Sequence, residues 1–121
     1  MTKQLKKLKN KKINIESGLY YCNESEDLYF EILDTVLEES PAKIELLTKW
    51  ASLNDFVGYY REVHALKNVT ATIGADQFNE YLSDLCTEMK TTNIFPSSAK
   101  VRGLMKQYIQ LLKIIEKSKK S

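Results

Sequence analysis

Hydrophobic residues recur every three or four positions along most of the chain from residue 13 onward. This spacing matches the 3.6-residue period of the α-helix and predicts amphipathic helices, each with one apolar face. The strict alternation that is typical of strands does not persist for more than a few positions anywhere in the sequence. Long amphipathic helices with short connections predict an all-α fold: an antiparallel up-down-up-down four-helix bundle over residues 13–119, with a short N-terminal segment.

Start and stop signals divide this pattern into four long helices. The first begins at Asn23 or Ser25 and extends to about residue 53, as one long kinked helix or as two stacked helices that meet near Pro41. Its apolar stripe is expected to contain Leu28, Ile32, Val36 and Leu37, flanked by Tyr29 and Leu33. The other helices are expected over residues 55–72, over residues 75–90, and from Ser97 or Ser98 to about residue 118.

The helix expected over residues 55–72 contains His64, the only histidine of the protein. One face of this helix is predicted to point inward and consists of Phe56, Tyr59 or Tyr60, Val63, Leu66, Thr70 and Ile73. Because each residue advances by about 100° around a helix, His64 lies about that far from the centre of the inward face. Its imidazole is therefore expected to point sideways out of the bundle. Gly74 is expected to end the helix in the left-handed conformation.

Lys67 follows His64 by three residues, a spacing that brings two side chains together on one helix, with Cβ atoms about 5–6 Å apart. An imidazole without strong neighbours is mainly neutral and nucleophilic at neutral pH. A neutral ring nitrogen with a cation beside it is a coherent acceptor site for a phosphoryl group. The alternative interpretation is an ordinary surface histidine whose distance from a lysine arises by chance.

The 121 residues fit one domain with a single modest core, and the net charge of +2 conceals a marked segregation of charge. Residues 1–12 contain six lysines and no acid; residues 13–91 contain five basic against fifteen acidic residues; residues 92–121 contain seven basic residues and one acid. We expect residues 1–12 to be a basic flexible lead or linker. Nucleic-acid binding through the basic ends is a weaker hypothesis, and no nucleic-acid partner is expected for the acidic body.

Several classes of site are not expected. Cys22 and Cys86 are far apart in the sequence, which favours free thiols over a disulfide or a metal site. The G-x-x-x-x-G-K-[ST] loop of nucleotide-binding proteins is absent, as is a set of residues for nucleophilic catalysis. The sequence contains no signal-peptide pattern and no apolar run long enough for a membrane span. The chain is therefore expected to be cytoplasmic, or the soluble part of a larger protein.

His64-Ala65-Leu66-Lys67, followed by small or polar residues and then Ile73-Gly74-Ala75, resembles the signature of histidine-containing phosphotransfer (HPt) domains. Gly18-Leu19 ahead of Asp27-Leu28-Tyr29 is similar to the family layout, and the resemblance covers roughly residues 13–117. One position departs from the pattern, because many members have glycine directly after the lysine and this chain has Asn68. We interpret Asn68 as a variant that bears on how closely a partner can approach.

The resemblance implies a phosphorelay carrier without a kinase site or enzymatic turnover of its own. His64 would be phosphorylated by the aspartyl-phosphate of a response-regulator receiver domain, which also supplies the Mg²⁺, and a hybrid sensor histidine kinase would stand upstream. Lys67 would neighbour the phosphate, and the docking surface would contain Tyr60, Arg61, Asn68 and Ala71. Tyr60 is equally compatible with packing at the edge of the core, and Arg61 with a solvated charge. The alternative function is a helical module that docks a receiver or another signalling partner without phosphotransfer.

Overall fold

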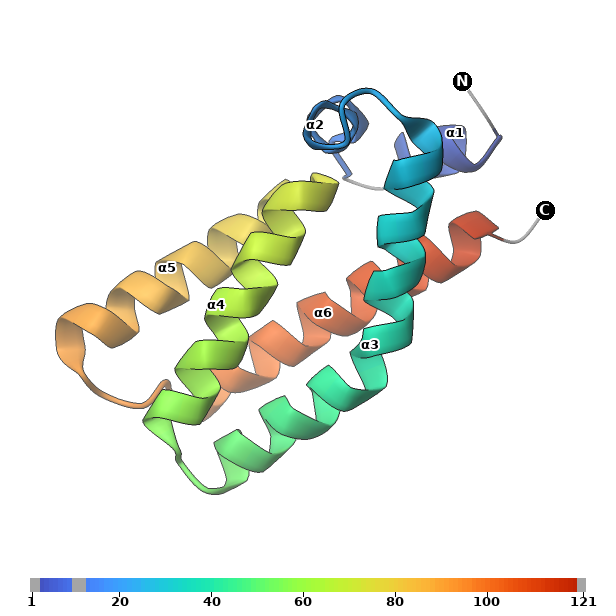
Figure 1. Ribbon diagram of the computed structural model, residues 1–121. Helices are drawn as coiled ribbons and strands as arrows, with labels where there is room; N and C mark the ends of the chain where they lie inside the picture. The colour runs from blue at the N-terminus through green and yellow to red at the C-terminus, as the bar shows by residue number, and fades with distance from the viewer. Residues whose placement is uncertain (1–2, 10–12, 120–121) are drawn as a thin grey trace.

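The computed structural model describes residues 3–9 and 13–119, and all the regular structure in these ranges is helical. Figure 1 shows long helices that follow one another, with shorter ones near the top of the molecule. The six helices are α1 (Lys3–Lys9), α2 (Ile15–Tyr21), α3 (Glu26–Ser52), α4 (Phe56–Ile73), α5 (Asp76–Thr92) and α6 (Ser98–Lys119). The expectation of an all-α fold is confirmed.

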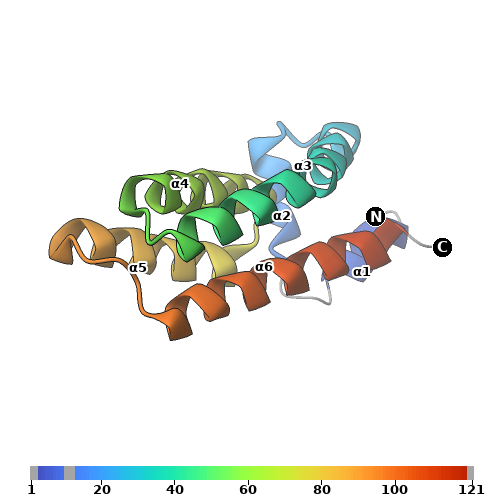
Figure 2. The ribbon, with the colours of Figure 1, turned by 90° about the horizontal axis from the view of Figure 1, so that it is seen from below.

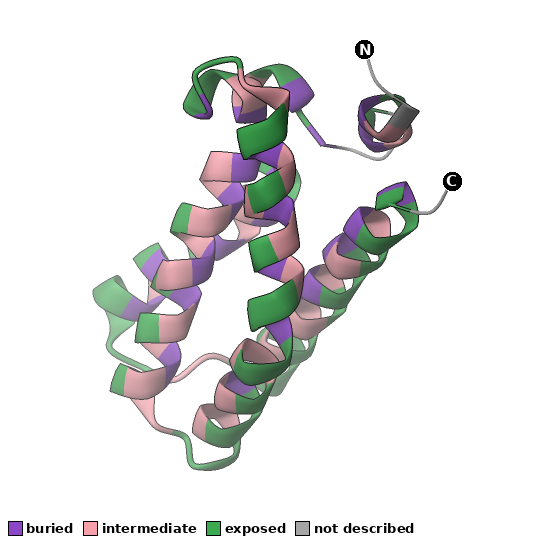
Figure 3. Cartoon of the chain, turned by 45° about the vertical axis from the view of Figure 1, so that its right-hand side comes forward, coloured by how far each residue is buried: buried purple, intermediate pink, exposed green. Residues whose placement is uncertain are grey.

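The four long helices pack in a closed ring: α3 on α4, α4 on α5, α5 on α6, and α6 back on α3. Within the described ranges, the diagonal pairs α3/α5 and α4/α6 make no direct contact between their backbones. Figure 2 shows α4 and α6 on opposite sides of the ring. Figure 3 shows that the buried residues lie mainly on the sides of the helices that face one another. The largest fully buried side chains include Tyr29, Tyr59, Leu82, Leu104 and Ile115.

Local capping determines where these helices begin and end. The Ser25 hydroxyl accepts a hydrogen bond from the Leu28 amide (3.2 Å), so Ser25 rather than Asn23 caps α3. The Asp55 carboxylate accepts one from the Gly58 amide (2.9 Å) at the start of α4. Gly74 ends α4 with φ of +82°, as predicted. A Cβ atom at Gly74 would also lie 2.0 Å from the Asn14 carbonyl oxygen, so this position requires glycine.

The structure resolves the alternatives for residues 25–53 in favour of one helix with Pro41 inside it. Figure 1 shows α3 changing direction along its length, as expected for a helix with an internal proline. The predicted apolar stripe is confirmed at Val36, which is buried, but it was wrong at the start of the helix, because Leu28 is 42 % exposed whereas the flanking Tyr29 and Leu33 are fully buried. The Tyr29 hydroxyl donates to the carbonyl oxygen of Ile73 (2.8 Å), which ties the start of α3 to the end of α4.

Part of the expected N-terminal lead, residues 3–9, forms helix α1. Leu5 and Leu8 are buried in it, and the helix packs on α6. The rest of the expected lead, residues 1–2 and 10–12, lies outside the described residues. Gly18 lies inside α2, where a Cβ atom would come within 2.3 Å of the Tyr29 ring. Tyr20, in the same helix, is 76 % exposed.

Candidate functional site

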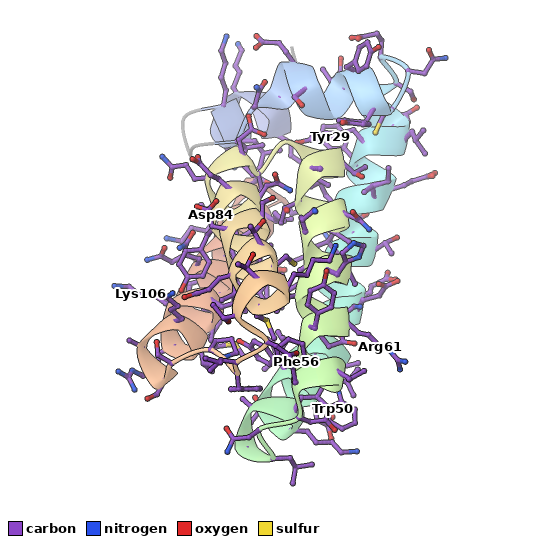
Figure 4. The ribbon with its side chains drawn as sticks, turned by 90° about the vertical axis from the view of Figure 1, so that its left-hand side faces the viewer. Tyr29, Trp50, Phe56, Arg61, Asp84 and Lys106 are labelled. Atoms are coloured by element: carbon purple, nitrogen blue, oxygen red, sulfur yellow. The ribbon has the colours of Figure 1, made fainter. Side chains whose placement is uncertain are left out.

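Helix α4 carries the candidate site and packs against α2, α3 and α5. Its inward face buries Tyr59, Val63, Leu66, Thr70 and Ile73, which confirms most of the predicted face and selects Tyr59 over Tyr60. Phe56, also predicted to point inward, is only half-buried, and its ring stacks on Tyr60. His64 is exposed, as its angular position predicted. Figure 4 views the molecule from the side of α4 and α5, and labels Phe56 and Arg61 of α4.

Three rings follow one another along the outer side of α4, at intervals of four residues. The Phe56 and Tyr60 rings are stacked, with centroids 6.3 Å apart and planes 5° apart. The Tyr60 ring in turn stacks on the His64 imidazole, at 6.0 Å and 27°. Residues four apart on a helix are neighbours, so the helix itself creates this row. We call Phe56, Tyr60 and His64 the ring row. It places the imidazole against a half-buried aromatic surface and leaves the histidine itself exposed.

Lys67 lies one turn beyond His64 and is half-buried. Within the described ranges its ammonium makes no hydrogen bond or ion pair, and none joins it to His64. Burial raises the pKa of the Cys86 thiol on α5, and the positive charges of Lys67 and Lys90 oppose that increase. Lys67 thus supplies a cation, without an ion-pair partner among the described residues, on the turn of α4 that follows His64.

The other predicted docking residues surround His64 with different exposures. Arg61 and Asn68 are exposed, whereas Tyr60 and Ala71 are half-buried. The acid nearest in sequence, Glu62, is directed toward α3, where its carboxylate forms an ion pair with Lys43 (3.5 Å). The side of α4 that presents Arg61, His64 and Asn68 thus contains cationic, aromatic and small polar groups.

Asn79 of α5 supports the site from beneath and was not identified from the sequence. Its side-chain amide donates to the carbonyl oxygen of Lys67 (2.6 Å) and to the Thr70 hydroxyl oxygen (3.1 Å). The Thr70 hydroxyl itself donates to the same Lys67 carbonyl (3.0 Å). These bonds hold the turn of α4 that follows His64 against α5. Asn79 lies in a mainly polar stretch, between Phe78 and Glu80, so no signal in the sequence set it apart.

Other kinds of site receive little support from the geometry. Cys22 and Cys86 are buried free thiols, on α2's C-terminal cap and on α5. In residues 3–9 and 13–119, no group of three or more His, Cys, Asp or Glu side chains is arranged to hold a metal ion. No helix in these ranges has the length and apolar character that crossing a bilayer requires.

Comparisons with known proteins did not identify a relative of this chain. No protein-family model, no curated protein and no solved structure matches the chain.

Proposed function

We propose that this protein is a phosphorelay intermediate: His64 accepts a phosphoryl group from the aspartyl-phosphate of a receiver domain and passes it to the aspartate of a second receiver. The observation that carries the proposal is the exposed imidazole of His64 at the end of the ring row, with the unpaired ammonium of Lys67 one turn further along α4. A nucleophile of this kind must be accessible to a partner, and His64 is accessible.

The transfer would require little covalent chemistry from the protein, since phosphoryl transfer depends mainly on positioning and electrostatic stabilisation. The lone pair of one imidazole nitrogen would form the N–P bond while the P–O bond to the receiver's aspartate breaks. The aspartate carboxylate would leave with the bonding electrons, and the other ring nitrogen would keep its proton. The Tyr60 ring would hold the imidazole in place, and Lys67 would stabilise the negative charge of the transferred group.

The arrangement of the long helices supports the same proposal. Consecutive helices that pack in a ring, with the diagonal pairs apart, suit the antiparallel up-down-up-down four-helix bundle of HPt domains. In such a bundle the outward face of a helix can contact a partner along the whole length of the helix. We propose that residues 13–119 form this domain and that α4 is its docking helix.

The docking surface would contain Tyr60, Arg61, Asn68 and Ala71, arranged around His64. Its cations complement the acidic, phosphorylated site of a receiver, where Mg²⁺ would also be bound by the receiver's own groups. The chain itself would be a carrier and not an enzyme, with a hybrid sensor histidine kinase as the upstream source. The expected setting is the cytoplasm, where these signalling partners operate.

The direct test is intact-mass analysis of the full chain after mixing with phosphorylated receiver domains. We expect a gain of one phosphoryl group that is lost in acid and is absent in His64→Gln. The same variant should keep the helical circular dichroism of the parent, because the side chain is exposed. If His64→Gln still acquires the acid-labile group, the assignment of the acceptor is wrong.

A docking module without phosphotransfer is the second candidate, because the exposed ring row would also serve as a recognition surface. The same experiment separates the two functions. A receiver that binds α4 but transfers nothing, with binding weakened by Tyr60→Ala, would replace the carrier with a docking module.

A further inference from the structure

A cleft of about 280 Å³ lies between α3 and α4, on the side of α4 away from His64. Its walls come from Ile32 and Val36 of α3 and from Leu66 and Val69 of α4. Several facing side chains are short or β-branched, including Thr35, Val36, Val69 and Thr72, so they do not fill the space between the two helices. A cavity of about 150 Å³ can hold benzene, so this cleft has room for one or two fused rings.

Tyr108 of α6 supplies the polar end of the cleft. The residue is only 2 % exposed, yet its hydroxyl makes no hydrogen bond with any residue in the described ranges. Tyr29, equally buried, donates its hydroxyl to the Ile73 carbonyl. The Tyr108 oxygen is not enclosed by the protein, because among the described residues only Glu26 Oε1 is a buried side-chain oxygen or nitrogen without a hydrogen-bond partner. The hydroxyl is therefore free to bond to water or to a ligand in the cleft. The Tyr108 hydroxyl therefore marks where a polar group of a ligand would bind.

The charges at the mouth determine the sign of that polar group. Lys43 lines the cleft and is paired with Glu62, whereas Glu39 is exposed and has no ion-pair partner among the described residues. Burial raises the pKa of Tyr108 to about 12, and the negative charges of Glu39 and Glu62 add to this increase. Because Lys43 is paired with Glu62, the unpaired carboxylate of Glu39 gives the mouth of the cleft a net negative charge, which favours a cation over an anion.

We propose that the cleft between α3 and α4 binds a small amphipathic amine. Its aromatic or alicyclic ring would lie among Val36, Leu66 and Val69, and its protonated amino group would donate to the Tyr108 hydroxyl oxygen and to the Glu39 carboxylate. This site is separate from the outward side of α4, so a ligand there leaves His64 uncovered.

The test is an NMR titration of the full chain with tryptamine and with indole-3-propionate, which share the indole ring and the two-carbon linker but carry opposite charges. We expect saturable shifts at residues of the cleft with tryptamine, and an affinity about tenfold lower for indole-3-propionate. Tyr108→Phe should weaken tryptamine binding by about threefold to tenfold, because it removes the hydroxyl and keeps the ring.

A matched pair of threonine variants locates the site. Thr35 and Thr48 are both exposed on α3 and both donate to the carbonyl oxygen four residues earlier, but only Thr35 lines the cleft. Thr35→Phe should block tryptamine and Thr48→Phe should not. The proposal fails if neither compound gives saturable shifts, if both bind equally, or if Thr35→Phe binds tryptamine as well as the parent. Because the titration measures binding alone, such a failure leaves the phosphotransfer proposal unaffected.

Discussion

Tyr59 and Tyr60 are adjacent in sequence, yet they belong to two faces of α4 with opposite environments. Tyr59 points inward, is 1 % exposed and lies 5.2 Å from the Phe95 ring, measured between ring centroids. Tyr60 is half-buried on the outer side and stacks between Phe56 and His64. The inward ring is surrounded by the core, whereas the neighbours of the outward ring include two from its own helix.

This difference shows which residues the fold constrains. An inward side chain must match the volume of the cavity that surrounds it, so its replacement changes the stability of the whole bundle. An outward side chain contributes little to the core and is available for chemistry or recognition. The two faces are nevertheless connected, because Asn79 fixes the backbone of α4 one turn from His64.

The largest effect on stability is expected at Tyr59, in comparison with its neighbour Tyr60. Tyr59→Ala should lower the free energy of unfolding by about 3–5 kcal/mol, because it leaves a cavity in the core. Tyr60→Ala should lower it by about 1 kcal/mol, since it removes only partly buried ring contacts. Chemical denaturation followed by circular dichroism measures both changes. Equal losses in the two variants would remove the distinction between the faces.

The next effect concerns the link between the faces. Asn79→Ala removes both donors to α4 and should lower the free energy of unfolding by about 1–3 kcal/mol, because the Lys67 carbonyl and the Thr70 hydroxyl lose a buried partner. The matched control is Gln77→Ala, an exposed position on the same helix, with an expected change within about 0.5 kcal/mol. Similar changes in the two variants would mean that Asn79 does not hold α4.

A smaller effect is expected on the outward face from Lys67→Ala, measured as the lifetime of phosphorylated His64 or the rate of transfer. Loss of the neighbouring cation should reduce one of these by about tenfold, equivalent to about 1.4 kcal/mol. Lys106→Ala is the control, because it removes the same charge from α6, which makes no backbone contact with α4 among the described residues. Unchanged kinetics and lifetime in Lys67→Ala would remove the role assigned to this lysine.

The smallest effect is expected at Asn68, the position where the HPt resemblance departs from glycine. The side chain is exposed, so Asn68→Gly should change stability by only about 0.3 kcal/mol and the transfer rate by less than about twofold. Stopped-flow or quench-flow measurement of transfer from a receiver tests the rate. A clear acceleration would show that the asparagine obstructs the approach of the partner.

The sequence alone predicted α4 well, because its signals are local and agree with one another. Asp55 caps its start, Gly74 ends it, and apolar residues follow one stripe closely enough to fix which side faces inward. The exposure of His64 follows from that stripe. The chemistry assigned to His64 and Lys67 is a proposal that rests on this geometry and on the resemblance.

The same reasoning chose the wrong phase for the start of α3. Leu28, Tyr29, Phe30, Ile32 and Leu33 place apolar groups almost all around the helix, so periodicity alone does not select one face. The neighbours select it: Tyr29 is inward because its ring fits against Gly18 and its hydroxyl reaches the Ile73 carbonyl. Helix α1 likewise depends on a distant partner, since Leu5 and Leu8 are buried where α1 packs on α6.

By itself, the sequence determined where the long helical segments lie, the two ends of α4 and the outward position of His64, because these depend on hydrogen bonds and periodicity within a few residues. Only the tertiary structure decided the inward face of α3, the support that Asn79 gives to α4, and the cleft beside Tyr108. These features join residues that are distant in the chain, and the shapes and hydrogen-bonding groups of facing helices determine them.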